Sequence, residues 1–505
     1  MVTPEEARAS RSRRAEGAVV ALLLLFALAL RLLALDRKNV WLDEAWTWKQ
    51  TTRSVPGVVA GTARDVHPPL YPLLMKAWAG LFGDSPSALR SPSVVAGVLA
   101  LFFAFRLGRP YLPRAALAGV LAWLAVSPSL LAHAQEARMY AMTTAAAVGA
   151  CASYRRWFDS GLERTASLAA FAAWSAVAVY LHYFGILVLA AAWAHFLLFR
   201  PRRAKDGPPA PDRRRLRRWL TANGAIAALF LPWLPIAVRQ VVRGQGWRQD
   251  VPLAEIPANA AELARGLLLG LEENAAFATR SGVLLALVAL TGLGRLAFQV
   301  ASGRARERDA FLLLVSFVPV TLGLAALPWT GRMDLWRYLS FLVPIVVLAI
   351  VRGFALPGLD PRLAVGVAIL GAASSVPLAL AHLASPSRDS DLRPVVAYMR
   401  SRVGPAADPP GSVFVTPAYM TLCTDYLLRG SPLSFVGVQE GAPLSRVVAA
   451  AARREGVTWV VVDGRSPYFE DARRDDRLRE VELPGGQPTR VRLFRVRETV
   501  AGNAP

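Results

Sequence analysis

Two adjacent carboxylates beside tryptophans are the residues of this sequence best suited to chemistry. Asp43 and Glu44 occur in the string WLDEAW at residues 41–46, directly after the first long apolar run. Ionisable groups near a bilayer are costly and therefore mark functional sites more often than they do in soluble proteins. We interpret one carboxylate as a general base and the other as its support. The alternative is that Asp43 is the N-cap of a helix lying on the membrane.

A rigid histidine motif follows in the same segment. The string DVHPPLY occupies residues 65–71, and proline restrains both itself and the residue before it. His67 is thereby presented at a defined place, where it could donate a hydrogen bond to a phosphate or a hydroxyl. A purely structural turn is the alternative for this motif.

Further polar residues are expected on the same membrane face. The strings QEARMY (135–140) and WRY (336–338) and the pair His182-Tyr183 each open an apolar run. An arginine near a helix N-terminus, such as Arg138, suits a phosphate because its planar fork and the exposed amides favour anions. The alternative is an arginine that snorkels to the interface. Arg138 and Arg337 both fall in loops expected outside, where topology disfavours them, so they need another reason to be there.

The elements that must position these residues are membrane-spanning helices. The chain has 505 residues, is 54% hydrophobic and has a mean hydropathy of +0.35. Apolar runs long enough to cross about 30 Å of hydrocarbon recur along it, which predicts a polytopic α-helical membrane protein with about eleven spans. Their expected centres are Leu25, Leu99, Ala122, Ala147, Ser175, Leu189, Leu229, Leu287, Val315, Val346 and Ile369.

The net charge of +22 indicates membrane topology, not nucleic-acid binding. From Arg388 onward there are 17 arginines and 14 acidic residues, so most of the positive charge belongs to the membrane half. Every second loop there is basic, as the positive-inside rule requires. We expect a multi-pass protein of the inner (plasma) membrane, with a cytoplasmic N-terminus and a C-terminus that is periplasmic or extracellular.

Three regions are predicted. Residues 1–17 form a basic cytoplasmic N-terminus, and residues 18–384 form the transmembrane domain, with a long first external loop at 36–91 that contains short helices. Residues 385–505 form a small external α/β domain. Its pattern predicts helices at 392–403, 418–429 and up to Arg454. It predicts strands at 413–415, 433–438 and 457–463, and an edge strand at 490–496.

Four smaller features support only limited predictions. The two cysteines, Cys151 and Cys423, fall in different regions, so no disulfide framework is expected. The first apolar run is longer than the usual 7 to 15 residues of a signal peptide, which favours a retained anchor. The composition of the basic loop 200–218 predicts a flexible cytoplasmic connection. Binding of lipid headgroups is the alternative. Asp463, at a predicted strand end, is expected in a turn.

The strings at residues 43–44 and 65–70 resemble the pattern of the protein O-mannosyltransferases of glycosyltransferase family 39, which are polytopic GT-C enzymes. The QEARMY string and the string RYL at 337–339 are similar to those of bacterial members of dolichyl-phosphate-mannose type. The lipid A aminoarabinose transferases share this architecture but carry a lysine where His67 stands. The resemblance covers residues 18–383 and is most specific in the first hundred.

The resemblance implies transfer of a sugar, mannose-like or related, from a polyprenyl phosphate to an acceptor hydroxyl on the external face, with inversion at the anomeric carbon. Asp43 would be the general base and Glu44 would orient the acceptor or the sugar. The donor phosphate would be bound by His67, Arg138, Arg337 and Tyr338. The residues implied in substrate contacts are Asp65, Glu136, Tyr140, His182 and Tyr183.

The implied partners are a polyprenyl-phosphate sugar, a lipid, glycan or protein acceptor, and membrane lipid. No spacing of ligands argues for a metal, so no cofactor is assigned, and a divalent cation at the histidines and carboxylates is left open. Two other classes compete with the enzyme. A flippase or transporter of lipid-linked sugars would be expected to show inverted repeats and broken helices near the midplane, whereas the charged residues here gather at one membrane face. A non-catalytic membrane scaffold whose tail binds partners is the third class, and only the enzyme should lose transfer activity when Asp43 is replaced with Asn.

Overall fold

The computed structural model describes residues 4–199, 202–203, 210–211, 213–243, 248–270, 275–385, 391–402, 412–416, 420–431, 433–437, 443–453, 458–466, 468–483 and 491–497. These residues form two compact units. A helical unit contains Met1–Leu35 and Ser54–Ala384, and an α/β unit contains Asp36–Arg53 together with Ser385–Pro505. The expected connection at 200–218 is described only in part. The two-residue strands β1 (Arg202–Arg203) and β2 (Ala210–Pro211) are placed in it. Residues 213–218 begin the helix α11 (Arg213–Phe230), so a flexible connection is wrong for that part.

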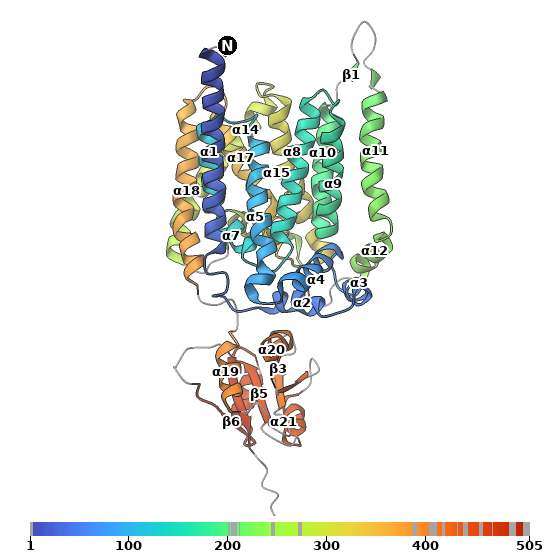
Figure 1. The fold of residues 1–505 in the computed structure, drawn as a ribbon, viewed down its shortest axis with the longest axis vertical. Helices are drawn as coiled ribbons and strands as arrows, with labels where there is room; N and C mark the ends of the chain where they lie inside the picture. Colours follow the sequence, from blue (N-terminus) through green and yellow to red (C-terminus); the bar gives the residue numbers. More distant parts are fainter. Residues whose placement is uncertain are drawn as a thin grey trace, which may run out of the picture. The chain divides into compact units, whose positions relative to one another are not determined.

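Each of the eleven expected span centres lies in a helix of the helical unit (Figure 1). Periodic apolar runs of this length form helices in a membrane because only a helix satisfies its own backbone groups there. The helices are α1 (Pro4–Leu32), α5 (Pro86–Gly108), α6 (Arg114–Ala125), α8 (Tyr140–Asp159), α9 (Thr165–Leu181), α10 (Ile186–Phe199), α11 (Arg213–Phe230), α14 (Ala275–Ala301), α15 (Glu307–Thr330), α17 (Val343–Ala355) and α18 (Pro361–Ala384).

Not all of these helices are long enough to cross a membrane alone. Among the described residues, 5 helices have the length and composition to do so, and up to 7 spans result if two bent helix pairs each count as one. The pairs are α6 with α7 (Pro128–Ala134), bent by 54°, and α11 with α12 (Leu234–Arg243), bent by 69°. Three shorter apolar helices lie at 165–181, 183–199 and 340–355. The expected helices are therefore present, but several are short or broken.

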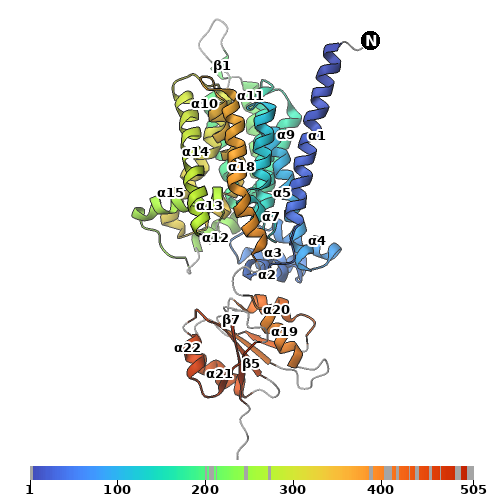
Figure 2. The ribbon, with the colours of Figure 1, turned by 90° about the vertical axis from the view of Figure 1, so that its left-hand side faces the viewer.

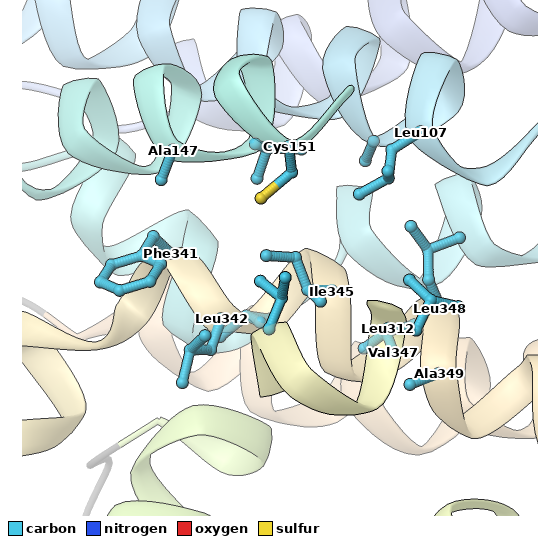
Figure 3. Packing of buried hydrophobic residues seen from close by; sticks show 14 of the residues in the cluster. Leu107, Ala147, Cys151, Leu312, Phe341, Leu342, Ile345, Val347, Leu348 and Ala349 are labelled. Atoms are coloured by element: carbon cyan, nitrogen blue, oxygen red, sulfur yellow. The ribbon is translucent and has the colours of Figure 1, made fainter. Parts of the chain in front are cut away.

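Buried apolar side chains join α5, α8 and α17 with the turn before α17. Figure 3 shows Leu107 of α5 and Cys151 of α8 facing Phe341, Ile345 and Leu348. All five are buried. The cysteines Cys151 and Cys423 are both buried, and neither forms a disulfide within the part of the chain that the structure describes.

Small residues allow other helices to approach closely. Gly353 of α17 lies against the backbone of Gly292 in α14, where a Cβ on Gly353 would collide with the carbonyl of Gly292. In the same way Gly371 of α18 faces the ring of Trp123 in α6. Figure 2 shows α18 beside α14. Close packing of backbones is a main source of helix association in a membrane, where burial from water gives no driving force between helices.

Ion pairs tie several of these helices together. Arg155 of α8 donates to the carboxylate of Glu307 at 2.9 Å and to that of Asp159 at 2.5 Å. Arg352 of α17 donates to Asp309 at 2.7 Å. Both guanidinium groups are therefore paired with carboxylates inside the helical unit. Buried charges require such partners because an isolated one is very costly.

The loop between the first two long spans consists largely of short helices, as expected. In the helical unit these are α3 (Val55–Ala63) and α4 (Leu70–Phe82), while α2 (Leu42–Thr51) belongs to the α/β unit. Figure 1 shows α3, α4, α7 and α12 gathered at one end of the bundle, with β1 and the start of α1 at the other. The first of these ends carries the residues described below.

The α/β unit contains a five-stranded sheet in the order β4-β3-β5-β7-β6. β3 pairs in parallel with β4 and β5, while β7 pairs antiparallel with β5 and β6. The elements are α19 (Arg393–Arg402), β3 (Ser412–Thr416), α20 (Thr421–Leu428), β4 (Ser434–Gly437), α21 (Leu444–Ala452), β5 (Thr458–Asp463), α22 (Tyr468–Arg474), β6 (Leu478–Glu480) and β7 (Val491–Val496).

The sequence expectation for this domain needs one correction. The helices and strands fall where the pattern predicted them, and β5 is buried at all its positions, as expected for a central strand. However, β7 is not an edge strand, because the unpredicted strand β6 covers its outer side. Three residues with one buried position give too weak a period to be recognised. Asp463 lies in the expected turn, where its carboxylate accepts from the amide of Arg465 at 2.9 Å.

Candidate functional site

The DVHPPLY string forms the turn between α3 and α4. The amide of Asp65 donates to the carbonyl of Thr62 at 3.0 Å, at the end of α3. The Nδ1 atom of His67 lies 3.1 Å from the Oδ2 atom of Asp65. Because Pro68 and Pro69 are restrained, α4 begins at once, at Leu70. The two side chains therefore form a fixed pair at this end of the bundle.

Asp65 is held in its charged form. Burial alone would raise the pKa of this carboxyl, but the hydrogen bond from His67 and the positive charges of His67 and Arg138 outweigh burial and lower the pKa below 3.8. Arg138 is thus electrostatically coupled to the turn. The negative charge of Asp65 also fixes the orientation of the imidazole, because a charged acceptor makes the stronger hydrogen bond.

His182 joins this turn to an aromatic cluster. Its ring centroid lies 5.7 Å from that of His67, 4.8 Å from that of Tyr338 and 6.2 Å from that of Tyr140. The rings of Tyr140 and Tyr338 are stacked, with centroids 6.3 Å apart. Residues from four separate parts of the sequence therefore meet here, at ring separations typical of favourable aromatic pairs.

His182 is neutral at physiological pH. Burial lowers its pKa well below 6.5, and the positive charges of His67, Arg138 and Arg248 lower it further. His182 ends α9 and precedes the short helix η1 (Tyr183–Gly185), and its Nδ1 atom accepts from the amide of Phe184 at 3.2 Å. A neutral ring with Nδ1 as acceptor carries its proton on Nε2, which leaves that atom as a hydrogen-bond donor.

The QEARMY string forms the buried corner between α7 and α8. The amide nitrogen of Gln135 donates to the carbonyl of Leu33 at 2.7 Å, and its oxygen lies 3.2 Å from His382 of α18. The carbonyl of Arg138 accepts from Ser93 at 3.2 Å. Arg138 is 5% exposed, so it is enclosed by protein and does not snorkel along the surface.

Glu136 is paired with a histidine that the sequence did not single out. Its carboxylate lies 3.5 Å from the Nδ1 atom of His133, and both side chains are buried. The ring of His133 stacks on that of Trp336 at 5.2 Å and lies 5.0 Å from that of Tyr140. Glu136 therefore joins the cluster through His133.

The WRY string belongs to a single helical turn, α16 (Leu335–Tyr338). The Nε atom of Arg337 lies 3.6 Å from the carboxylate of Asp334, and the guanidinium lies over the ring of Trp336 at 5.2 Å. Gly266 of α13 (Ile256–Leu269) packs on Trp336, where a Cβ would come within 2.5 Å of that side chain. Arg337 is therefore held by Asp334 and Trp336. Its neighbours Trp336 and Tyr338 belong to the aromatic cluster.

Tyr183 has a different setting from its neighbour. Its hydroxyl donates to Gln240 of α12 and accepts from the indole of Trp233 at 2.8 Å. Gln240 in turn donates to the carbonyl of Thr62 at 2.8 Å. Tyr183 therefore supports the end of α3, directly before Asp65, and its hydroxyl is committed to protein contacts.

Asp43 and Glu44 lie in the first turn of α2, in the α/β unit. The N-cap of this helix is Trp41, so the interpretation of Asp43 as the N-cap is wrong. The backbone carbonyl of Asp43 accepts from the hydroxyl of Thr47 at 3.1 Å. Negative charges at this position are favourable because the amides of the first turn carry a partial positive charge.

Three residues of the cluster were missed from the sequence. His133 and Trp336 show no local signal beyond their places next to selected residues. Arg248 raises the local positive charge felt by His182 and donates to the carbonyl of Thr330 at 3.3 Å. Arg248 lies between two apolar runs of the sequence, as Arg138 and Arg337 do, so the argument that selected those two residues could also have selected Arg248. No group of three or more potential metal ligands occurs among the described residues.

With this geometry established, known proteins can be compared. Residues 66–210 match the model of the family described as dolichyl-phosphate-mannose-protein mannosyltransferase. No curated protein matches the sequence. The family match covers the HPP turn, the QEARMY corner and His182, and so includes most of the cluster just described.

Solved structures share the fold at low identity. ArnT from Cupriavidus metallidurans in the apo state is similar, with a TM-score of 0.61 and 14% identity over 97% of this chain and 100% of that one. The same protein bound to undecaprenyl phosphate gives 0.59 and 14% over 96% and 99%. The archaeal oligosaccharyltransferase AglB from Archaeoglobus fulgidus, in complex with an inhibitory peptide and a dolichol-phosphate, gives 0.55 and 13% over 90% and 70%. This chain therefore has the fold of the GT-C membrane glycosyltransferases and carries, over residues 66–210, the sequence pattern of the dolichyl-phosphate-mannose-protein mannosyltransferase family.

Proposed function

We propose that this protein transfers a sugar from a polyprenyl phosphate to a hydroxyl group of an acceptor. The observation that carries the proposal is the cluster of Asp65, His67, Arg138 and His182 at one end of a membrane helix bundle with the GT-C fold. Within this cluster Arg138, His67 and neutral His182 are donors that suit a phosphate, and the Asp65 carboxylate holds His67 in place. A multi-pass membrane location agrees with the apolar helices.

The cationic groups would bind the donor phosphate and stabilise it as it leaves. Arg138 offers a planar fork that matches phosphate oxygens, and Arg337 stands beside the same aromatic cluster. His67, held by Asp65, and Tyr338 would add hydrogen bonds. Because polyprenyl phosphate leaves already ionised, electrostatic stabilisation replaces a general acid.

The aromatic and neutral groups would hold the sugar. Tyr140 and neutral His182 lie next to the phosphate-binding groups and can exchange hydrogen bonds with sugar hydroxyls without adding charge. Glu136 and Asp65 would contact the substrate or set the orientation of the histidines beside them. Tyr183 is better suited to supporting the turn than to touching substrate, because its hydroxyl is already engaged.

Asp43 would act as the general base. It would take the proton of the acceptor hydroxyl as the acceptor oxygen bonds to the anomeric carbon and the bond from that carbon to the phosphate oxygen breaks. A single displacement of this kind inverts the anomeric carbon, and Glu44 would orient the acceptor. In the orientation we propose, the N-terminus is cytoplasmic, and the cluster and the α/β unit face the outside of the inner membrane.

The proposal is tested with purified protein in detergent. Undecaprenyl phosphates carrying tritium-labelled mannose, glucose or arabinose would be incubated with total membrane lipid as acceptor. We expect wild type to transfer or hydrolyse one of these donors, and Asp43→Asn to lose about 100-fold or more in turnover. Binding of undecaprenyl phosphate should be equal in the two proteins.

Two results would contradict this proposal. Equal turnover by wild type and Asp43→Asn would remove Asp43 as the base. No turnover of any donor, together with movement of the labelled lipid across reconstituted vesicles, would favour the flippase alternative.

A further inference from the structure

Residues 36–53, which include both candidate catalytic carboxylates, are structurally part of the α/β unit. They cluster with residues 385–505, although more than 330 residues of helical bundle separate the two in sequence. The helix α2 has only 10 residues, and isolated helices shorter than about 12–15 residues are marginal in water. Its conformation must therefore depend on what it packs against.

The C-terminal half of α2 docks on α20. The ammonium of Lys49 lies 2.6 Å from the carboxylate of Asp425. The ring of Trp48 meets that of Tyr426 edge to face, with centroids 5.3 Å apart. Tyr426 is also held by Arg429, whose guanidinium lies 3.8 Å from the centroid of the Tyr426 ring and donates to the Tyr426 carbonyl at 2.6 Å.

The chain before α2 is held by a second contact in the same unit. Arg393, at the start of α19, donates to the carbonyl of Arg37 at 2.7 Å. Its guanidinium is itself fixed by the carboxylate of Asp391 at 2.7 Å. Asp43 and Glu44 therefore lie between two attachment points, one before the helix and one in its second half.

The helical geometry distinguishes the two carboxylates. Glu44 and Trp48 are four residues apart and share one face of α2, the face that carries the tryptophan contact. Asp43 is turned by about 100° from Glu44. A base must keep a fixed direction toward its substrate, since a displacement of about 1 Å can cost roughly 100-fold in rate.

We propose that the C-terminal α/β domain is a positioning element of the transferase, with Asp425 and Tyr426 orienting Asp43 through α2. This inference rests on the proposed function, because it takes Asp43 as the base. Asp425 acts through Lys49 and does not touch the substrate. Its loss should therefore lower kcat and leave the KM for the lipid donor unchanged, since the proposed phosphate-binding groups belong to the helical unit.

The test is charge reversal and restoration in the full-length protein. Asp425→Lys should lower kcat about tenfold or more at unchanged KM for the labelled undecaprenyl-phosphate sugar that wild type turns over. The double variant Lys49→Asp with Asp425→Lys restores the pair in reverse and should recover most of the rate. If Asp425→Lys folds poorly, Lys49→Gln is measured in its place. Lys49 is half-exposed, and we expect this variant to lose less kcat than Asp425→Lys, in the same direction.

A matched control is available in the same domain. Asp475 and Arg477 form an ion pair at 2.7 Å, remote in sequence from both α2 and α20. Asp475→Lys is the same reversal and should leave kcat unchanged. Asp43→Asn is measured in parallel. Wild-type kcat in Asp425→Lys and Lys49→Gln, with Asp43→Asn inactive, would overturn the positioning role alone. Wild-type kcat in Asp43→Asn would instead overturn the proposed base.

Discussion

The Nδ1 atom of His67 and the Oδ2 atom of Asp65 are 3.1 Å apart, in a turn that two prolines hold rigid. In this pair the ionised carboxylate of Asp65 accepts a hydrogen bond from His67 and thereby orients the imidazole ring. It lies between α3 and α4, beside the ring of His182.

Replacing Asp65 with Asn should lower turnover about 10- to 100-fold, because His67 loses the charged partner that fixes its ring. The folded-state pKa of Asp65 is depressed below 3.8, so the pair stabilises the fold above that pH, and this contribution is lost as the pH falls through the depressed value. The difference in melting temperature between wild type and Asp65→Asn should therefore be constant at neutral pH and shrink below about pH 4. A difference that grows toward low pH would contradict the assignment.

Replacing His182 with Gln tests whether this histidine works in its neutral form. The unfolded chain takes up a proton at about pH 6.5, while the folded-state pKa lies well below that value. Wild type should therefore lose stability as the pH falls below about 6.5, and His182→Gln should lose less. Wild-type kcat should show no inflection from His182 between pH 6 and 8. An inflection near 6.5 that disappears in His182→Gln would show that the ring titrates in the folded protein.

Replacing Arg138 with Lys keeps the charge and removes the planar fork. We expect affinity for undecaprenyl phosphate to fall about tenfold, corresponding to the loss of one charge-assisted hydrogen bond. The measurement is equilibrium binding of labelled undecaprenyl phosphate in detergent. Arg308→Lys is the matched control, since Arg308 donates to the carbonyl of Pro110 between α5 and α6. Equal weakening in both variants would point to a general effect on the bundle.

Gly353→Ala should destabilise the helical unit by about 1–3 kcal/mol, because the added methyl group collides with the backbone of Gly292. Gly366→Ala is the matched control. Gly366 lies in α18 with nothing within 4 Å of an added Cβ, so the same change should be neutral or slightly stabilising there. Thermal unfolding of both variants in one detergent checks this. Similar melting temperatures would mean that α14 and α17 are not closely packed in solution.

The sequence determined where the helices and most of the strands lie. Apolar run length and period are local properties, so all eleven expected centres fall in helices, and β3, β4 and β5 appear at their predicted positions. The same local reasoning selected Asp65, His67 and Arg138 as candidate site residues, because prolines and arginines outside the positive-inside pattern are visible without a structure. It missed β6 and wrongly put β7 at the edge of the sheet. The position of a strand in a sheet depends on its partners, which a local pattern does not show.

Only the tertiary structure decided which of these residues meet. The stacking of His133 on Trp336 joins positions that lie 203 residues apart in sequence, and the attachment of Lys49 to Asp425 spans 376. It also assigned Asp43 and Glu44, on α2, to a different compact unit from the histidine turn that follows them closely in sequence. Contacts of this kind come from the packing of whole elements against one another. No local pattern of residues specifies that packing, so no reading of the sequence alone could supply it.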